Sequence, residues 1–294
     1  MNKPRLGFIG MGLMGVPMTR RLLAAGYQVS VWNRSADKAQ AMQDDGAQPV
    51  SSLAQLVGSS DILMICVTDS AAVENVVLGP DGIAGYARAG QILVDFSSID
   101  PQATRDMAAA LKARCGVEWV DAPVSGGVAG AEQGTLAIMA GGDESLIDRL
   151  RPVLAPLSQR VTRMGPVGAG QVTKIGNQML VSCNVLVMAE VMAMAEKAGV
   201  DASLIPAALQ GGFADSVPLQ LTGPRMASRD FDDVKWHVKT LLKDLDMAND
   251  LARKIHTAVP MAGLGAELMR LHASQGNADK DPCTLVSMYT EKNG

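Results

Sequence analysis

Short apolar runs alternate with helical segments along the first half of the chain. Short apolar runs of this kind are typical of buried strands. The predicted strands are Leu6–Ile9, Gln28–Trp32, Asp61–Val67, Gln91–Asp95, Glu118–Asp121 and Leu136–Ala140. The helices predicted among them are Arg20–Ala25, Asp37–Asp45, Ala71–Val77 and Pro101–Arg114. Because strands that alternate with helices form parallel sheets with crossover connections, we expect an α/β domain built on a parallel sheet.

The alternation stops after the last of these strands, and helical periodicity continues to the end of the chain. The helices predicted there are Gln171–Ala198, Ala202–Gln210, Leu219–Met226, Val238–Lys254 and Pro260–Gln275. The change falls near Val161–Gly170, where glycine and proline suit a turn before a long helix. We therefore expect an α/β domain over residues 1–164, followed by an all-helical domain over residues 165–294 that the long helix joins to it.

The composition changes this picture little, but it excludes several classes of partner. Hydrophobic residues make up 48% of the 294 residues and charged residues 19%, as in a folded globular chain. The net charge of -4 gives no basic surface of the kind that binds nucleic acid, so small molecules are the expected partners. The cysteines are widely spaced and form no CxxC pair, which predicts neither a disulfide framework nor a zinc site and favours a reducing cytoplasm.

The sequence also gives no sign of export or of a membrane partner. Met1–Arg5 leads directly into the first predicted strand, without the charged, apolar and cleavage regions of a signal peptide. The most apolar later stretch, Met179–Ala195, is short for a bilayer span and is interrupted by Asn184 and Glu190. We interpret this stretch as a buried helix.

A GxGxxG motif directly follows the first predicted strand. It consists of Gly10, Met11, Gly12, Leu13, Met14 and Gly15. In such a motif Gly10 permits the tight turn, Gly12 lets the backbone approach a pyrophosphate, and Gly15 allows a helix to pack closely on the strand. A glycine-rich turn that serves packing alone is the alternative. The setting between a strand and a helix favours a Rossmann dinucleotide-binding site.

The second predicted strand ends in Asn33, Arg34 and Ser35, where an NAD-specific site would place an acid on the ribose hydroxyls. An acid would repel a 2′-phosphate, whereas Arg34 can pair with it, and Asn33 and Ser35 can add hydrogen bonds. The segment therefore favours NADP over NAD. Alternatively, Arg34 is a solvated loop residue and the protein does not distinguish the two cofactors.

Three further segments carry polar groups that a hydride-transfer site requires. Asp121–Gly127 follows a strand, and its serine and glycines can turn a hydroxyl and backbone N–H groups toward a carboxylate. Lys174 and Asn177 lie about one helical turn apart and so share a face. Lys243 and Asp244 stand in a third segment. By spacing alone, each of these could equally be an ordinary turn or a polar helix-face residue.

Taken together, these ordered motifs resemble the 3-hydroxyisobutyrate dehydrogenase family of β-hydroxyacid dehydrogenases, which includes tartronate semialdehyde and glyoxylate/succinic semialdehyde reductases. The resemblance covers nearly the whole chain. It rests on Gly7–Gly15 with Met18, on Asp121–Gly127, on Gly170–Asn177 and on Lys243–Leu245.

The resemblance implies a catalytic role for Lys174 and a substrate-holding role for Asn177. The substrate's carboxylate would be bound by Ser125, Gly126 and Gly127. Many members of the family carry Asn-Asn at the positions of Asn177 and Gln178, so it stays open whether Gln178 also reaches the substrate.

The resemblance further implies that Lys243 lies near the nicotinamide and that later loops contact the cofactor. The loop residues are Val67, Thr68 and Ser98. The family's fold is a Rossmann domain and a helical domain joined by a long helix, which agrees with the pattern above. The family commonly forms dimers or tetramers through its helical domain, so a homodimer or homotetramer is implied.

In this account Lys174 handles the proton that accompanies the hydride. During reduction of an aldehyde, an ammonium group stabilises the charge that develops on the carbonyl oxygen and can donate a proton to it. Oxidation requires the neutral amine, and an unperturbed lysine has a pKa of about 10.4. We therefore expect oxidation to be faster at alkaline pH.

Other readings of the sequence have less support. An NAD-dependent dehydrogenase of the 3-hydroxyisobutyrate type is the nearest alternative. A cofactor-bound sensor or scaffold without turnover belongs to another class, although it would have no need of Lys174 and Asn177. No Gly-x-Ser-x-Gly elbow or Walker loop supports a hydrolase or kinase. The three histidines have no paired acid at ligand spacing, so we expect no metal.

Overall fold

The computed structural model of the chain describes residues 3–290. The chain divides into two compact units, Met1–Lys174 and Ile175–Gly294, called here the α/β unit and the helical unit. The long helix α8 (Ala169–Lys197) begins in the first unit and continues into the second. The expected fold class, a Rossmann domain followed by an all-helical domain, is confirmed.

The α/β unit is built on one mainly parallel sheet. Its strands are β1 (Leu6–Ile9), β2 (Val29–Trp32), β3 (Gln48–Pro49), β4 (Ile62–Ile65), β5 (Ile92–Asp95), β6 (Glu118–Asp121), β7 (Val124–Ser125), β8 (Leu136–Gly141) and β9 (Ser158–Gly165). Their order is β3-β2-β1-β4-β5-β6-β8-β7, with β9 paired to β8. The order reverses at β1, and a dinucleotide binds beyond the carboxyl ends of the strands at such a point.

The sheet departs from parallel pairing at one edge. Strand β8 runs antiparallel to β6 and β7, whereas β9 is parallel to β8. The chain turns back at Gly134, whose φ of 71° ends the preceding helix in the left-handed conformation. Only the sheet from β3 to β6 is therefore parallel throughout.

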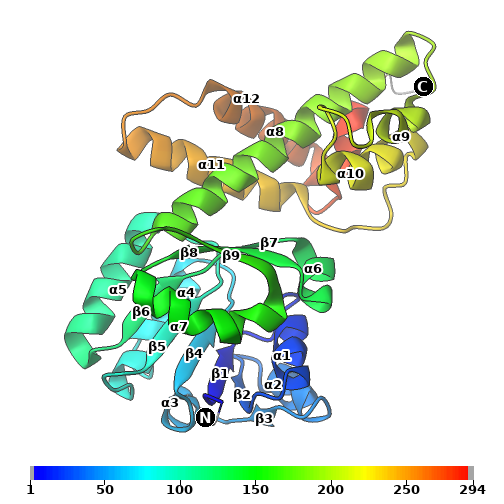
Figure 1. Cartoon of the computed structure of the whole chain (residues 1–294). Helices are drawn as coiled ribbons and strands as arrows, with labels where there is room; N and C mark the ends of the chain where they lie inside the picture. Colours follow the sequence, from blue (N-terminus) through cyan, green and yellow to red (C-terminus); the bar gives the residue numbers. More distant parts are fainter. Residues whose placement is uncertain (1–2, 291–294) are drawn as a thin grey trace. The chain divides into compact units, whose positions relative to one another are not determined.

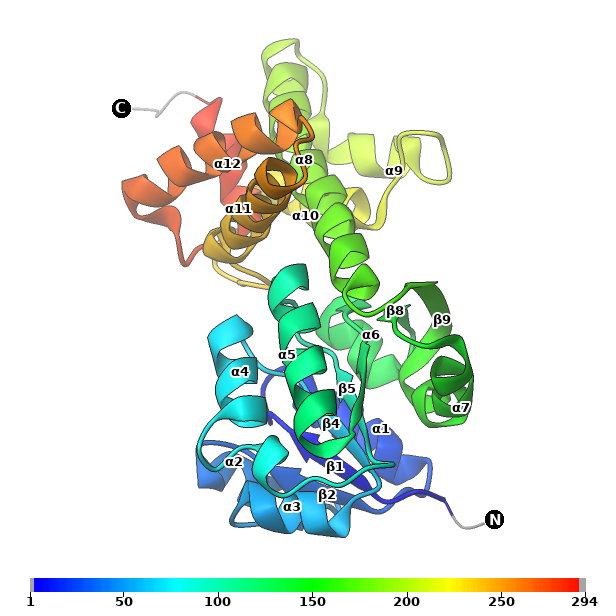
Figure 2. The same ribbon diagram turned by 90° about the vertical axis from the view of Figure 1, so that its left-hand side faces the viewer.

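Helices cover both faces of this sheet (Figure 1). They are α1 (Gly15–Ala24), α2 (Ala36–Gln40), α3 (Leu53–Ser59), α4 (Ser70–Leu78), α5 (Pro101–Cys115), α6 (Gly127–Gln133) and α7 (Glu144–Leu154). Helices α1, α6 and α7 share a buried apolar cluster with one face of the sheet, and α3, α4 and α5 share another with the opposite face. Figure 2 shows α4 and α5 side by side on that second face.

Several element boundaries differ from the sequence-based expectation. Helix α1 begins at Gly15 rather than Arg20, because a proline such as Pro17 is tolerated in a first helical turn. Helix α2 ends at Gln40, and a single 3₁₀ turn over Ala41–Gln43 follows it. The alternation does not stop after β8, since α7 and β9 follow. Helices α3, α6 and α7 and strands β3, β7 and β9 were not expected.

The helical unit contains the rest of α8 and four further α-helices among the residues described. These are α9 (Ile205–Leu209), α10 (Val217–Ser228), α11 (Val238–Lys254) and α12 (Pro260–His272). Helices α11 and α12 pack side by side, as Figure 2 also shows. Helix α12 ends earlier than expected and leads into a turn at Gly276 with φ of 88°, and a 3₁₀ helix over Pro282–Met288 was not expected.

Helix α8 is apolar on two faces, and only one of them is buried. Val185, Ala189 and Met192 belong to the core of the helical unit. Leu180 is 77% exposed and Met194 65% exposed, so the interpretation of this stretch as a buried helix is wrong for the second face. Among residues 3–290, α8 alone is long and apolar enough to cross a membrane, which is weak evidence because core helices meet the same criterion.

Candidate active site

The glycines of the GxGxxG motif are of two kinds: some are required by the fold, and one leaves space for a ligand. Gly10 has φ of 104°, and a Cβ atom there would lie 2.1 Å from the carbonyl oxygen of Cys66. A Cβ atom on Gly15 would lie 1.8 Å from the carbonyl oxygen of Gly10. In contrast, a Cβ atom on Gly12 would meet nothing within 4 Å. The fold therefore requires Gly10 and Gly15, while the space in front of Gly12 is open to a ligand.

The start of helix α1 lacks a side-chain cap. Its N-cap residue Met14 makes no capping hydrogen bond, whereas Ser52, Asp69 and Asp100 cap α3, α4 and α5 with their side chains. Uncapped N–H groups at the start of a helix are well placed to bind phosphate oxygens. The residues present therefore fit the pyrophosphate of a dinucleotide.

Asn33 ties two loops of this region together. Its Oδ1 accepts a hydrogen bond from the backbone N–H of Met11 at 2.9 Å, and its Nδ2 donates to the carbonyl of Ser35 at 3.0 Å. Arg34 and Ser35 are exposed, and Arg34 has no ion-pair partner among residues 3–290. Asn33 thus positions the loops, and Arg34 is the group available to a 2′-phosphate.

The loop after β4 lies next to the glycine-rich loop, and the loop after β5 lies next to the loop after β4, because β1, β4 and β5 follow one another in the sheet. The backbone N–H of Val67 donates to Oγ of Ser97 at 3.0 Å, which joins the two loops. The hydroxyl of Thr68 donates to Asp69 at 2.8 Å, and Ser98 is half-buried. These predicted cofactor residues therefore share the carboxyl edge of the sheet.

Two buried carboxyl groups stand side by side at the same edge, since Asp95 and Asp121 are register partners on β5 and β6. Oδ1 of Asp95 accepts the N–H of Ser97 at 2.9 Å, but Oδ2 has no partner among the described residues. Burial, with a smaller contribution from Asp121, raises the pKa of Asp95 to about 7. Burial also raises the pKa of the nearby Cys66 thiol to about 12, so this thiol is not a nucleophile.

Asp121 holds the start of helix α8. Its Oδ1 accepts the N–H of Gly168 at 2.7 Å, and its Oδ2 accepts the N–H of Gln171 at 3.0 Å. Burial raises the pKa of Asp121, although these backbone hydrogen bonds oppose the rise. A Cβ atom on Gly170 would lie 2.3 Å from the carbonyl oxygen of Met139, so the first turn packs tightly on the sheet. Half-buried Lys174 follows Gln171 by about one turn.

The Ser125–Gly127 segment forms the bend between β7 and α6. Gly126 has φ of 136° and Gly127 has φ of 63°, conformations that favour glycine. Both glycines are exposed, and a Cβ atom on Gly127 would meet nothing within 4 Å. The bend therefore presents backbone groups and the half-buried Ser125 to open space.

A chain of polar contacts links the predicted residues of the helical unit. Nδ2 of Asn177 donates to Oε1 of Gln178 at 2.8 Å, and Nε2 of Gln178 donates to Oδ2 of Asp244 at 2.5 Å. Nζ of Lys243 lies 3.4 Å from Oδ1 of Asp244, whose side chain is 7% exposed. Gln178 therefore connects Asn177 to the buried carboxylate that pairs with Lys243.

The structure brings several of the predicted residues together in two groups, one within each unit. The glycine-rich loop, Arg34 and the loops after β4 and β5 lie along the carboxyl edge of the sheet. Asn177 and Lys243 are joined inside the helical unit. The sequence analysis did not predict that Gln171 and Asp244 hold these residues in place. Both lie within motifs named above, Gly170–Asn177 and Lys243–Leu245.

Two of the three histidines have structural partners. His272 is 1% exposed, its Nε2 lies 2.8 Å from Oγ1 of Thr284, and burial lowers its pKa. Nδ1 of His237 lies 2.9 Å from the carbonyl oxygen of Asp279. Within residues 3–290, no group of three or more His, Cys, Asp or Glu side chains is arranged to hold a metal ion.

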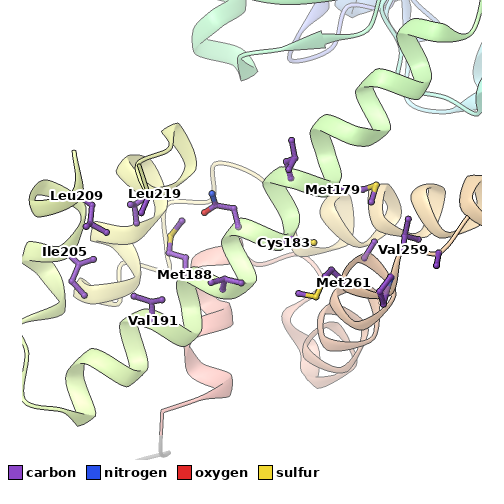
Figure 3. A pocket seen from close by; sticks show the side chains of 16 residues that line it. Met179, Cys183, Met188, Val191, Ile205, Leu209, Leu219, Val259 and Met261 are labelled. Carbon is purple, nitrogen blue, oxygen red and sulfur yellow. The ribbon is translucent and has the colours of Figure 1, made fainter. Parts of the chain in front are cut away.

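An apolar pocket of about 670 Å³ lies in the helical unit, between α8, α9, α10 and the start of α12 (Figure 3). Met179, Cys183, Val191, Leu209 and Met261 are among its lining residues. Its lining contains no cationic side chain that could bind a carboxylate. This pocket is therefore unsuited to a small hydroxy acid.

Comparison with known families assigns both halves of the chain. The family model described as the NAD binding domain of 6-phosphogluconate dehydrogenase matches residues 5–165. The family model described as NAD-binding of NADP-dependent 3-hydroxyisobutyrate dehydrogenase matches residues 168–289. A nicotinamide dinucleotide is therefore the cofactor of this chain.

Similar proteins cover the chain from end to end. The 2-hydroxy-3-oxopropionate reductase of Escherichia coli is 37% identical over 282 residues, which are 96% of each chain. The NAD-dependent L-serine dehydrogenase of Pseudomonas aeruginosa is 31% identical and covers 99% of each chain. A solved structure of 3-hydroxyisobutyrate dehydrogenase from Mycobacterium tuberculosis with L-serine has a TM-score of 0.88 at 27% identity, over 99% of this chain and 100% of that one. The chain thus belongs to the 3-hydroxyisobutyrate dehydrogenase family and is an NAD(P)-dependent oxidoreductase that acts on the CH–OH group of small hydroxy acids.

Proposed function

We propose that this enzyme interconverts a short semialdehyde carboxylate and its hydroxy acid, with NADP preferred and Lys174 as the catalytic group. The observation that supports this most directly is that the start of α8 is held against the sheet. Asp121 and the tight packing of Gly170 hold this helix against the carboxyl edge of the sheet, one turn before Lys174.

The protein's own contribution to the reaction is alignment and control of one proton. A bound nicotinamide supplies or accepts the hydride. Lys174 stabilises the negative charge that develops on the carbonyl oxygen and donates a proton to it. In the reverse direction its neutral amine accepts the proton of the alcohol.

The substrate's acid end and reacting end are held by different residues. Ser125, Gly126 and Gly127 bind the carboxylate through the serine hydroxyl and backbone N–H groups. Asn177 holds the oxygen beside the reacting carbon, and Gln178 orients its amide group. In this proposal Gln178 acts by orienting Asn177, since its carboxamide bonds both Asn177 and the buried Asp244.

The cofactor is bound along the carboxyl edge of the sheet, with its pyrophosphate on the loop from Gly10 to Gly15. Arg34 pairs with the 2′-phosphate, and the Ser35 hydroxyl, which caps no helix, adds a hydrogen bond. Val67, Thr68 and Ser98 contact the nicotinamide half, and Lys243 lies near the ring. Residues 1–164 thus bind the cofactor, and residues 165–294 serve the substrate and the oligomer.

The helical unit also mediates a homodimer or homotetramer. The lining of the apolar pocket in Figure 3 includes Leu180 and Val187 of α8, whose side chains are exposed. Exposed apolar surface of this extent commonly marks an interface between proteins. We place the enzyme in the cytoplasm, where its thiols stay reduced.

The direct experiment is a rate survey with the purified enzyme. It compares 2-hydroxy-3-oxopropionate, other small semialdehydes, 3-hydroxyisobutyrate and L-serine, each with the NADP and NAD forms of the cofactor. We expect the highest kcat/KM for a semialdehyde with NADPH. A higher value for L-serine or 3-hydroxyisobutyrate with NAD would favour the alternative, an NAD-dependent dehydrogenase like the Pseudomonas relative.

A further inference from the structure

The side chain of Gln171 is buried at the point where helix α8 meets the sheet. It is 1% exposed, and both the oxygen and the nitrogen of its carboxamide make hydrogen bonds. Oε1 accepts the N–H of Ile99 at 3.1 Å, and Nε2 donates to the carbonyl of Ser97 at 2.8 Å. One side chain therefore fastens the start of α8 to the loop after β5.

The loop that Gln171 holds is itself fastened to its neighbours. Oγ of Ser97 accepts the N–H of Val67 at 3.0 Å, and the N–H of Ser97 donates to Asp95 at 2.9 Å. The backbone of Gln171 is in turn held by Asp121. A continuous set of hydrogen bonds thus runs from the loop after β4, through Ser97, to the helix that carries Lys174.

We propose that Gln171 is a positioning residue for the reaction, which fixes the turn bearing Lys174 relative to the cofactor loops at Val67 and Ser98. This inference rests on the proposed role of Lys174. Because a misplacement of about 1 Å can cost a hundredfold in rate, loss of such a tie affects turnover more than it affects binding.

A second buried glutamine supplies a matched control. Gln91 is 3% exposed, and its Nε2 donates to the carbonyls of Val57 at 2.9 Å and Ser60 at 2.8 Å. Its Oε1 accepts the N–H of Arg88 at 2.9 Å. Gln91 therefore has the same chemistry and burial, but it lies at the amino end of β5, the end opposite to Ser97.

The experiment compares Gln171→Met with Gln91→Met in the full-length enzyme. We expect both to lower Tm to a similar extent, since each breaks bonds of a buried carboxamide to the backbone. Only Gln171→Met should lower kcat, by about tenfold to a hundredfold, with the dissociation constant of NADPH changed less than about threefold. Its deuterium isotope effect on kcat, measured with NADPH labelled at the transferred hydrogen, should rise because misalignment slows the hydride step.

A measurement without cofactor tests the same hydrogen bonds between Gln171 and the loop after β5. Backbone hydrogen exchange over residues 168–176 should become about tenfold faster in Gln171→Met and stay unchanged in Gln91→Met. If Gln171→Met does not fold, Gln171→Glu keeps the shape and the acceptor for Ile99 and loses the donor to Ser97, with Gln91→Glu as its control.

The outcomes separate this inference from the proposed function. Equal kcat and equal exchange for the two methionine variants, with Lys174→Met inactive, would overturn the role of Gln171 and leave Lys174 in place. Full activity of Lys174→Met would instead remove the proposed function on which the inference rests.

Discussion

The carboxamide of Gln178 donates a hydrogen bond to Oδ2 of Asp244 at 2.5 Å and so joins α8 to α11 within the helical unit. The same carboxamide accepts a hydrogen bond from Asn177. A single polar side chain thereby orients a proposed substrate residue and satisfies a buried carboxylate that also pairs with Lys243.

Replacing Gln178 by leucine should weaken substrate binding. The change leaves Asp244 short of a donor and Asn177 without an acceptor, so we expect KM for the substrate to rise about tenfold, as for the loss of one hydrogen bond to a charged group. The dissociation constant of the cofactor should stay within about twofold. Steady-state kinetics and cofactor fluorescence titration measure the two quantities.

Gln220→Leu is the matched control for this variant, because Nε2 of Gln220 donates to Oδ1 of Asp215 at 2.7 Å elsewhere in the helical unit. It should leave KM unchanged. An equal rise in KM for both variants would mean that Gln178 acts only through general stability.

Replacing Arg34 by glutamine should change the cofactor preference. Without the guanidinium group the 2′-phosphate loses a charge-assisted pair, so kcat/KM with NADPH should fall about tenfold to a hundredfold while the value with NADH hardly changes. The control is Arg88→Gln, an exposed arginine near the amino end of β5. An unchanged ratio of the two rates would show that Arg34 is a solvated loop residue.

Stability should depend on pH through Asp95. Its folded-state pKa of about 7 lies above the value near 3.9 in an unfolded chain. Between these two pH values Asp95 keeps its proton in the folded protein and has released it in the unfolded chain. The contribution of Asp95 to stability therefore falls as the pH rises. Above about pH 7 this contribution no longer changes. Asp95→Asn removes this dependence, and its stability relative to wild type should rise from pH 4.5 to pH 8 by up to about 3 kcal/mol.

Urea unfolding at the two pH values measures this difference. Asp61→Asn is the control: hydrogen bonds from Arg5 lower the pKa of Asp61, so this carboxyl is ionised in both the folded and the unfolded chain and its variant should differ from wild type by nearly the same amount at both pH values. A constant difference between Asp95→Asn and wild type across this range would contradict a raised pKa at Asp95.

The exposed apolar face of α8 should hold the oligomer together. The double variant Leu180→Glu with Val187→Glu places two charges on this face, and light scattering should then find a monomer where the wild-type enzyme is a dimer or tetramer. Tyr86→Glu, at a half-exposed residue of the α/β unit, should leave the mass unchanged. Retention of the wild-type mass in the double variant would place the interface elsewhere.

The strands that could be predicted are those whose own residues carry the signal. Leu6–Ile9 is apolar throughout because both of its faces are buried, and β1 has the predicted bounds. Strand β9 carries no such signal, since Arg160, Thr162 and Arg163 are exposed and it exists through pairing with β8. Its formation depends on the partner strand and not on its own pattern.

Helix α7 is a different case, because its signal was present in the sequence. Asp143 caps the helix, and Leu146, Ile147, Leu150 and Leu154 follow at helical spacing and are buried. These features satisfy the usual criteria for a helix start and an amphipathic face. Pro152 lies within this helix, and a proline inside a helical pattern counts against a helix.

Site residues could be predicted where a sequence motif reflects a constraint on the backbone. They could not be predicted where the role of a side chain depends on which neighbours the fold places around it. Gly10 and Gly15 have the backbone constraints that the motif implies. Asn33 was expected to bind phosphate, and its side chain also bonds Met11 and Ser35, a second use of the amide that no sequence pattern indicates. Gln171 reads as an ordinary helix residue until the fold places Ser97 and Ile99 beside it.

The most direct test of the account is the turnover of Lys174→Met, measured together with NADPH binding and compared with Lys197→Met on the same helix. We predict that Lys174→Met loses at least about a thousandfold in kcat, as expected when the group that stabilises the developing charge is removed, and still binds NADPH. Lys197→Met, at an exposed lysine, should retain wild-type turnover. Wild-type turnover in Lys174→Met would contradict the mechanism proposed for this enzyme.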